Sequence, residues 1–228
     1  GGGAGARGGA IAPGEARALL ADGLAALGYE PDDETVRRLL VYLQEIELWN
    51  PRLKLVAASG RELVVKHLLD SAAGAAALAA RGLLTAGVRL ADMGSGAGLP
   101  GIPIAILHPE VSVDLVERSE RRVGFLRNAR ARLRLENVTI RNEPMERYRG
   151  PADLIVFRAF LPFTGDLLRD LRAGLAPGGA ICAWKGRREA IAAELDGLGD
   201  EPGGGLEAEV VPVAVPFLDD ERHVVVLR

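Results

Sequence analysis

One glycine-rich segment constrains the fold of this 228-residue chain more than any other. Residues 92–101 (D-M-G-S-G-A-G-L-P-G) follow an apolar run, residues 87–91, that predicts a buried strand. They precede residues 102–107, which predict a helix with its proline in the first turn. Glycines allow a ligand to approach the backbone, and a helix N-terminus offers free N–H donors and partial positive charge. Strand, loop and helix together therefore predict a site for a charged or phosphorylated small molecule.

Two glycine patterns compete within this loop. The G-x-G-x-x-G pattern of dinucleotide-binding proteins is met by Gly96, Gly98 and Gly101. The pattern acid-x-G-x-G-x-G is met by Asp92, Gly94, Gly96 and Gly98. The second pattern resembles motif I of class I S-adenosylmethionine (SAM) methyltransferases, where the acid meets the ligand's ammonium directly or through water. We favour it because Pro100 disfavours helical geometry at Leu99, where the dinucleotide pattern needs a helix. A tight turn without a ligand is the remaining alternative.

The next predicted strand, residues 111–116, alternates in polarity and is followed by Glu117. An acid about 20 residues beyond the glycines, at the tip of the next strand, suits a ribose, because a carboxylate accepts hydrogen bonds from both hydroxyls. NAD and SAM both carry that ribose, so Glu117 does not separate them. A solvated charge at a strand end is the alternative interpretation.

The order of predicted elements favours an α/β fold. From residue 88 onward strands and helices alternate, which predicts a parallel sheet. The expected strands are 88–93, 111–117, 138–142, 153–158 and 179–185, and the expected helices are 101–108, 120–134, 164–174 and 187–197. Residues 207–228 predict an antiparallel hairpin, which is typical of a class I methyltransferase rather than a dehydrogenase.

Three helices are expected before the first strand. They are residues 15–27, a helix capped by Asp32 or Asp33 and ended by Asn50-Pro51, and residues 61–80. We therefore expect a disordered tail at 1–12, a helical cap at 13–80 and a Rossmann-like domain at 81–228.

Charge, cysteine content and the length of apolar runs limit the kinds of protein that this chain can be. The net charge is −3, so the whole chain has no basic character, but residues 117–149 hold ten arginines against five glutamates. Such a block tracks phosphates or forms a solvated helix face. The single cysteine, Cys182, excludes a disulfide framework and a zinc cluster and fits a reducing cytosol. No run reaches the ~20 apolar residues of a membrane span. We expect a cytoplasmic protein without a metal.

Further motifs point to one family. They are residues 65–71 (V-K-H-L-L-D-S), 100–103 (P-G-I-P), 121–126 (R-R-V-G-F-L), 157–160 (F-R-A-F), 185–186 (K-G) and 221–224 (E-R-H-V). With the glycine loop they resemble the RsmG (GidB) family, bacterial enzymes that methylate N7 of a guanine in the decoding-region hairpin of 16S ribosomal RNA. The resemblance runs from about residue 40 to 228. The chain departs from the family pattern at residues 54–56, Phe157 and Trp184.

The resemblance implies a class I methyltransferase fold with a small N-terminal helical part, SAM as cofactor, and 16S rRNA or the small ribosomal subunit as partner. The implied target is the guanine at rRNA position 527. Guanine N7 carries a lone pair and no proton, so the reaction needs no general base. Free rRNA, an assembly intermediate and the intact subunit all stay open as substrate, and we expect a monomer.

The resemblance also implies site residues. Those expected to bind SAM are Asp92, Gly94, Ser95, Gly96, Gly98, Leu99, Glu117, Met145, Glu146 and Arg158. Those expected to act in catalysis at strand ends are Arg158 and Lys185. Those expected to contact RNA are Lys66, His67, Arg121, Arg122 and Arg222. A small-molecule methyltransferase, a non-catalytic SAM-binding assembly factor and, more distantly, an NAD-dependent oxidoreductase are the alternatives.

Overall fold

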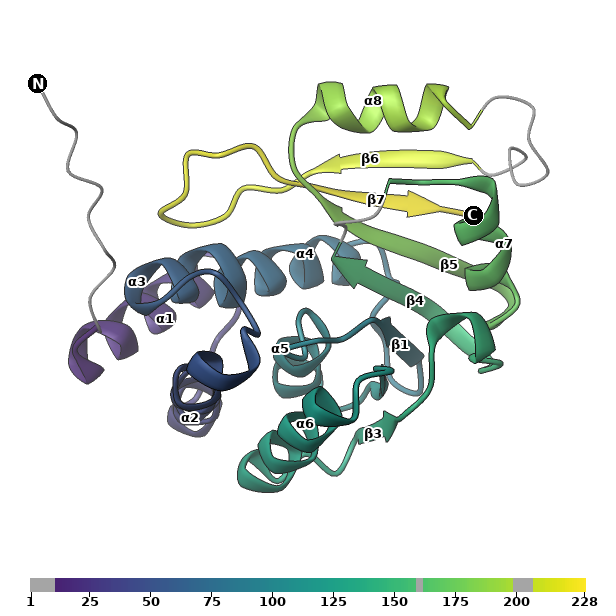
Figure 1. The fold of residues 1–228 in the computed structure, drawn as a ribbon. Helices are drawn as coiled ribbons and strands as arrows, with labels where there is room; N and C mark the ends of the chain where they lie inside the picture. The colour runs from purple at the N-terminus through teal and green to yellow at the C-terminus, as the bar shows by residue number, and fades with distance from the viewer. Residues whose placement is uncertain (1–10, 159–161, 199–206) are drawn as a thin grey trace, which may run out of the picture.

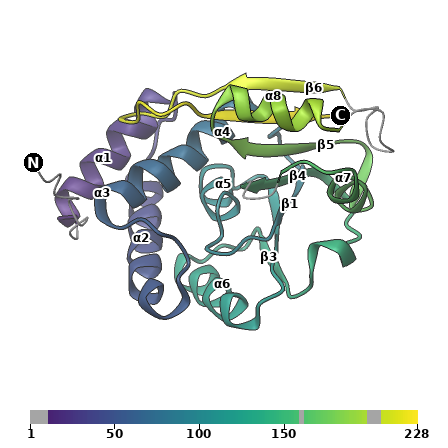
Figure 2. The ribbon, with the colours of Figure 1, turned by 45° about the horizontal axis from the view of Figure 1, so that its top comes forward.

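A single seven-stranded sheet organises the computed structural model, which describes residues 11–158, 162–198 and 207–228 (Figures 1 and 2). The strands are β1 (Arg89–Met93), β2 (Ser112–Val116), β3 (Val138–Arg141), β4 (Ala152–Arg158), β5 (Leu175–Lys185), β6 (Ala208–Pro212) and β7 (His223–Leu227). Their order is β3-β2-β1-β4-β5-β7-β6. Strands β1 to β5 are parallel, and β7 is antiparallel to both β5 and β6. The expected α/β sheet with an antiparallel end is confirmed.

The parallel pairing brings the carboxyl ends of the central strands to one edge. Met93 of β1 lies opposite Val116 of β2, and Arg158 of β4 lies opposite Trp184 of β5. In open α/β sheets ligands bind at this edge, where loops leave the strands. The residues that follow these strand ends are therefore candidates for a ligand site.

Helices cover both faces of the sheet. They are α5 (Gly101–Leu107), α6 (Glu120–Leu133), α7 (Gly165–Arg172) and α8 (Arg188–Asp196), with the short 3-10 helix η2 (Met145–Arg147) after β3. Residues of α5 and α6 share one core with one face of the sheet, and residues of α7 and α8 share a second core with the other face. Pro103 lies in the first turn of α5, as expected.

The N-terminal part consists of α1 (Pro13–Ala26), α2 (Asp33–Leu53) and a helical run of α3 (Gly60–Leu63), the π-helical segment η1 (Val64–Leu69) and α4 (Asp70–Ala79). Its buried residues belong to the same core as α5 and α6: α2 packs on α5 and α6, and α4 packs on α5 and on β7 (Figure 2). Of the expected disordered tail at 1–12, residues 1–10 lie outside the described residues.

Some expected boundaries are wrong; β5, for example, begins at Leu175 and not at residue 179. Asp32 caps α2 by accepting a hydrogen bond from the Thr35 N–H (2.7 Å), but Asn50-Pro51 does not end this helix. The helix continues to Leu53, because Lys54 adopts a left-handed conformation (φ 49°) and its N–H donates to the Asn50 carbonyl. A proline so close to the C-terminus removes only one hydrogen bond of the last turns.

Within the described parts of the chain, no helix has both the length and the apolarity to cross a bilayer. The same residues contain no group of three or more His, Cys, Asp or Glu side chains placed to hold a metal ion.

Candidate cofactor and substrate site

The glycines of the loop after β1 divide into two structural roles. Gly94, Gly96 and Gly98 all have positive φ (66°, 56° and 86°). A Cβ at Gly94 or Gly96 would have room, whereas one at Gly98 would collide with Ile102 and one at Gly101 would lie 2.5 Å from Leu115. The first two glycines therefore leave open space above the strand end, and the last two allow α5 to pack closely.

Asp92 and Ser95 fix this loop from behind. Asp92 is completely buried, and its Oδ2 accepts a hydrogen bond from the Gly101 N–H (3.0 Å) at the start of α5. Its Oδ1 has no hydrogen-bond partner among the described residues, and burial raises the pKa of this carboxyl to about 7. Ser95 donates its hydroxyl to the Asp92 carbonyl (2.8 Å) and its N–H to the Val116 carbonyl (3.0 Å). The loop is thus tied to both β1 and β2.

A cleft of about 610 Å³ opens beside Gly94. Its lining includes Glu117, Met145 and Glu146, three of the expected cofactor residues. Glu117 is buried, and its two carboxylate oxygens accept hydrogen bonds from the Gly96 N–H (3.0 Å) and the Ser119 N–H (2.8 Å). Each of these oxygens keeps a second lone pair, so Glu117 can still accept hydrogen bonds from the hydroxyls of a ligand.

A second cavity of about 380 Å³ also borders Gly94. Its lining residues are Leu55, Val56, Ala57, His67, Gly94, Ser95, Gly96, Ala97, Leu99, Arg122 and Arg158. A smaller apolar cavity of about 130 Å³, lined in part by Met145, Phe157 and Arg158, adjoins both at Gly94. Gly94 and Arg122 line both larger cavities, so the two spaces meet at the glycine loop.

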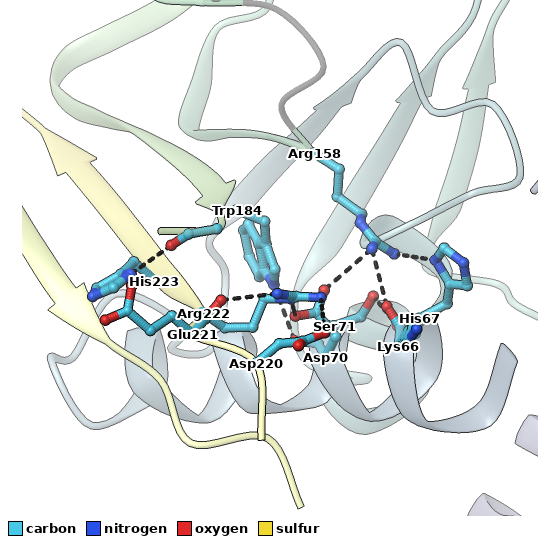
Figure 3. Close-up of polar contacts among 11 residues, drawn as sticks. Lys66, His67, Asp70, Ser71, Arg158, Trp184, Asp220, Glu221, Arg222 and His223 are labelled. Atoms are coloured by element: carbon cyan, nitrogen blue, oxygen red, sulfur yellow. Dashed lines mark hydrogen bonds and ion pairs between the residues drawn. The ribbon is translucent and has the colours of Figure 1, made fainter. Parts of the chain in front are cut away.

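Arg158 enters this site from the end of β4 and is held by three groups of the N-terminal helices (Figure 3). Its Nη2 lies 3.3 Å from Asp70 Oδ2 and donates to the Lys66 carbonyl (3.1 Å). Its Nη1 lies 2.9 Å from His67 Nδ1. Burial, with the positive charge of Arg158 beside it, lowers the pKa of His67 to about 3, so this imidazole is neutral at pH 7 and accepts the hydrogen bond.

The expected RNA-contacting residues lie in different settings. Arg222 lies beside Asp70 as well, with its Nε 3.4 Å from Asp70 Oδ1 (Figure 3). Lys66 is half-buried and pairs with Glu62 (2.7 Å). Arg121 is exposed on α6 and donates to the Arg52 carbonyl (3.4 Å). The structure thus brings His67, Arg122 and Arg158 to one cavity, places Arg222 behind it and leaves Arg121 outside its lining.

Lys185 lies apart from these cavities. Its ammonium is buried in an ion pair with Glu194 of α8 and lies 4.3 Å from the centre of the Phe163 ring. Glu194 also accepts a hydrogen bond from the Phe163 N–H (3.0 Å). Lys185 is not among the described residues that line the three cavities, whereas Pro162 and Thr164 line the largest. Its contacts therefore support the segment around Phe163.

Comparison with known proteins assigns the chain to a family. The family model described as GidB, rRNA small subunit methyltransferase G, matches residues 35–199. The chain belongs to the GidB family. The "Ribosomal RNA small subunit methyltransferase G" of Azoarcus sp. (strain BH72) is 37% identical, with 91% of this chain and 94% of that protein covered. The protein of the same name from Xanthomonas campestris pv. campestris (strain 8004) is 38% identical, with 96% and 98% covered.

Solved structures support the fold. Magnesium protoporphyrin IX methyltransferase (ChlM) from Synechocystis PCC 6803, solved with bound SAM, has a TM-score of 0.54 at 18% identity and covers 87% of this chain and 98% of its own. TrmN from Thermus thermophilus has a TM-score of 0.51 at 20% identity, with 72% and 53% covered. The fold is that of a class I SAM methyltransferase.

Two of the three departures from the GidB pattern lie at the cavities. Leu55 and Val56, in the segment 54–56, line the 380 Å³ cavity, and Phe157 lines the smallest one. Trp184 instead packs on α4: its indole N–H donates to the Asp70 carbonyl (3.2 Å), and a Cβ at Gly74 would collide with its ring. The glycine therefore makes room for the bulky Trp184.

Two site residues were not predicted from the sequence. Asp70 occurs within the V-K-H-L-L-D-S motif, where an acid inside an apolar helix is the available signal. Tyr42 of α2 is fully buried and donates its hydroxyl to the Ala97 carbonyl of the glycine loop (2.6 Å). Its signal is weaker, because a tyrosine in the buried stripe of a helix is usual in a core.

Proposed function

We propose that this chain transfers the methyl group of SAM to N7 of a guanine in 16S ribosomal RNA. Membership of the GidB family supports the reaction class. The observation that carries the proposal is that the 610 Å³ cleft and the 380 Å³ cavity meet at Gly94. A methyl transfer between two bound molecules needs two adjoining sites whose reacting atoms can be brought into line.

The cleft beside Glu117 fits the cofactor. Gly94 and Gly96 leave the backbone open at the strand end, Glu117 offers acceptors for the ribose hydroxyls, and Met145 gives an apolar surface for the adenine. Asp92 is buried and lines none of the three cavities, so we propose that its Oδ1 acts on the ammonium group through a water molecule. When bound, SAM supplies an electrophilic methyl carbon on a sulfonium sulfur.

Alignment and not proton transfer is the main task of the chain in this reaction. Guanine N7 has no proton to lose, so the residues have to hold the base at the cavity and exclude water. His67 fits such a role, because its Nδ1 accepts a hydrogen bond from Arg158 and its ring stays neutral near pH 7, so it is not a proton donor or acceptor in the reaction. Holding two reactants in line lowers a barrier by up to about 7–11 kcal/mol.

The RNA side is proposed for the cavity lined by Arg122 and Arg158. Arg122 lies where the two cavities meet. The exposed Arg121 on α6 and the half-buried Lys66 on η1 add positive charge. Lys185 is proposed to act indirectly, because it braces the segment around Phe163. Phosphate contacts of this kind weaken steeply as salt rises.

The test is methyl transfer from radiolabelled SAM to small ribosomal subunits and to 16S rRNA that lack the modification, followed by mapping of the labelled base. We expect label on guanine N7 at one decoding-region position. Label on a free metabolite would identify a small-molecule methyltransferase. SAM binding by calorimetry without transfer to any RNA would identify a non-catalytic assembly factor, and both results would contradict the proposal.

We expect the enzyme in the cytoplasm, because small ribosomal subunits assemble there. We also expect it to be a monomer. Light scattering on the purified protein measures its mass in solution, and the mass of a dimer would contradict the second expectation.

A further inference from the structure

A buried carboxylate outside the three cavities connects two arginines of the substrate side (Figure 3). Asp70 is 3% exposed and begins α4, directly after the π-helical segment η1. Its Oδ2 lies 3.3 Å from Arg158 Nη2, and its Oδ1 lies 3.4 Å from Arg222 Nε. The two arginines come from the end of β4 and from the residue before β7, so Asp70 joins three segments that are distant in sequence.

Arg158 depends on Asp70 for its electrostatic environment. The guanidinium of Arg158 is largely buried, and burial lowers its pKa. Its other two partners, the Lys66 carbonyl and the neutral His67 ring, carry no formal charge. A buried charge is strongly destabilised when its partner of opposite charge is removed, so the carboxylate of Asp70 decides where this guanidinium rests.

The position of Arg158 matters because its side chain lines two of the three cavities that border Gly94. Asp70 lines none of them, so any effect of Asp70 on a bound guanine passes through Arg158. The three groups around the guanidinium, Asp70, the Lys66 carbonyl and His67, fix its direction as well as its place, since each offers a different acceptor (Figure 3).

We infer that Asp70 is a positioning residue for methyl transfer: its two carboxylate oxygens hold Arg158 toward the substrate cavity and Arg222 behind it. The inference rests on the proposed function for its consequence in catalysis. Its structural part, the orientation of the Arg158 guanidinium by Asp70, is testable without any methyl transfer.

The chain offers a matched control. Glu45 is a buried acid on α2, 4% exposed, that pairs with Arg132 (3.1 Å) and with Asn128 of α6. It joins two helices of the same core but lines none of the cavities described. Glu45→Gln therefore removes a buried charge away from the cavities, and Asp70→Asn removes one beside Arg158.

The first experiment measures methylation of small ribosomal subunits by Asp70→Asn, Arg158→Ala, the double variant and Glu45→Gln, with SAM affinity by calorimetry. We expect kcat/KM for the subunit to fall roughly 10- to 100-fold in Asp70→Asn, as misplacement of a reacting group does, with unchanged SAM affinity. The double variant should be no worse than Arg158→Ala, because the two residues act as one unit.

Several outcomes would overturn the inference. They are wild-type activity in Arg158→Ala, activity of Asp70→Asn equal to that of Glu45→Gln, or losses that multiply in the double variant. If Asp70→Asn does not fold, Asp70→Glu keeps the charge but displaces the carboxylate by one methylene, and the same comparison applies to it.

The second experiment separates this inference from the proposed function. Nitrogen NMR of arginine side chains, with the Arg158 signal assigned by its loss in Arg158→Lys, reports how freely the guanidinium rotates. We expect hindered rotation in the wild type and in Glu45→Gln and free rotation in Asp70→Asn. Free rotation in the wild type would refute the positioning role, even if methyl transfer occurs. Hindered rotation without any methyl transfer would instead refute the proposed function.

Discussion

The cleft beside Glu117 and the cavity beside Arg158 both border Gly94, but they are held together in different ways. In the cleft, Glu117 is fixed by two backbone N–H groups, one in the glycine loop and one two residues along the chain. In the cavity, Arg158 is fixed by side chains and a carbonyl from helices about 90 residues earlier in the sequence. The first arrangement follows from local strand–loop–helix geometry, and the second exists only once the N-terminal helices have packed on the sheet.

Two buried acids, one in each region, also differ in their partners. Asp70, next to the cavity beside Arg158, faces two arginines. Asp92, behind the cleft beside Glu117, has a single backbone N–H donor on Oδ2 and no partner on Oδ1 among the described residues. Removal of the charge should therefore have opposite consequences for stability at the two positions.

The largest expected effect concerns Asp92 and pH. Burial raises the pKa of this carboxyl from 3.8 to about 7, so the folded protein holds a proton that the unfolded chain releases between these values. The stability that this group contributes is full below pH 4 and is lost as pH rises to about 7. Between pH 5 and 8 the wild type should lose about 2–3 kcal/mol of unfolding free energy relative to Asp92→Asn, at about 1.36 kcal/mol per pKa unit.

Urea unfolding of both proteins at pH 5 and pH 8 measures this difference. Asp153→Asn is the control, because the Arg89 partner lowers the pKa of Asp153 and its effect is constant across this range. Parallel stability curves for the wild type and Asp92→Asn would show that Asp92 is charged throughout.

The next effect is loss of cofactor affinity in Glu117→Ala. Hydrogen bonds to a charged group contribute about 1.5–3 kcal/mol each, so SAM should bind roughly 10- to 100-fold more weakly in calorimetry. Asp114→Ala is the matched control: this acid lies on β2, the strand that Glu117 follows, and pairs with Arg141 (3.2 Å) and Tyr148 (3.0 Å), but it lines none of the cavities. Equal loss of affinity in both variants would assign the effect to the strand and not to the ribose site.

A smaller effect is expected for Gly94→Ala. A residue with a side chain costs about 1–2 kcal/mol in the left-handed conformation that Gly94 adopts at φ 66°. Gly87 has φ 83° and open surroundings away from the cavities, so Gly87→Ala carries the same backbone cost. Both variants should lose similar unfolding free energy, but only Gly94→Ala should bind SAM more weakly. Wild-type SAM affinity in Gly94→Ala would place the cofactor elsewhere.

The smallest effect tests the contact between helix α2 and the glycine loop. Tyr42→Phe removes the hydroxyl that α2 gives to the Ala97 carbonyl of the glycine loop, a hydrogen bond worth about 0.5–1.5 kcal/mol. We expect SAM affinity to fall a few-fold. Tyr29→Phe removes a hydroxyl that contacts His108 (3.0 Å) and should leave SAM affinity unchanged. Equal affinities in the two variants would mean that the helices do not support the cofactor cleft.

The sequence predicts the cleft better than the cavity for a physical reason. Gly94 and Glu117 are identified by local patterns, because a strand end, a glycine turn and the next strand have fixed spacing in α/β proteins. Asp70 is not, since its partners Arg158 and Arg222 are brought to it only by tertiary packing. The same reason explains Lys185: its place at the end of β5 is predictable, but its pairing with Glu194 on α8 is not.

Methyl transfer to unmodified small subunits at rising SAM concentration tests most directly whether the cleft binds the cofactor and the cavity binds the guanine. We predict that Glu117→Ala regains the wild-type rate at saturating SAM, because its defect is cofactor affinity, and that Arg158→Ala stays slow at every SAM concentration. Recovery of Arg158→Ala at high SAM, or no recovery of Glu117→Ala, would contradict the assignment of the cleft to the cofactor and the cavity to the guanine.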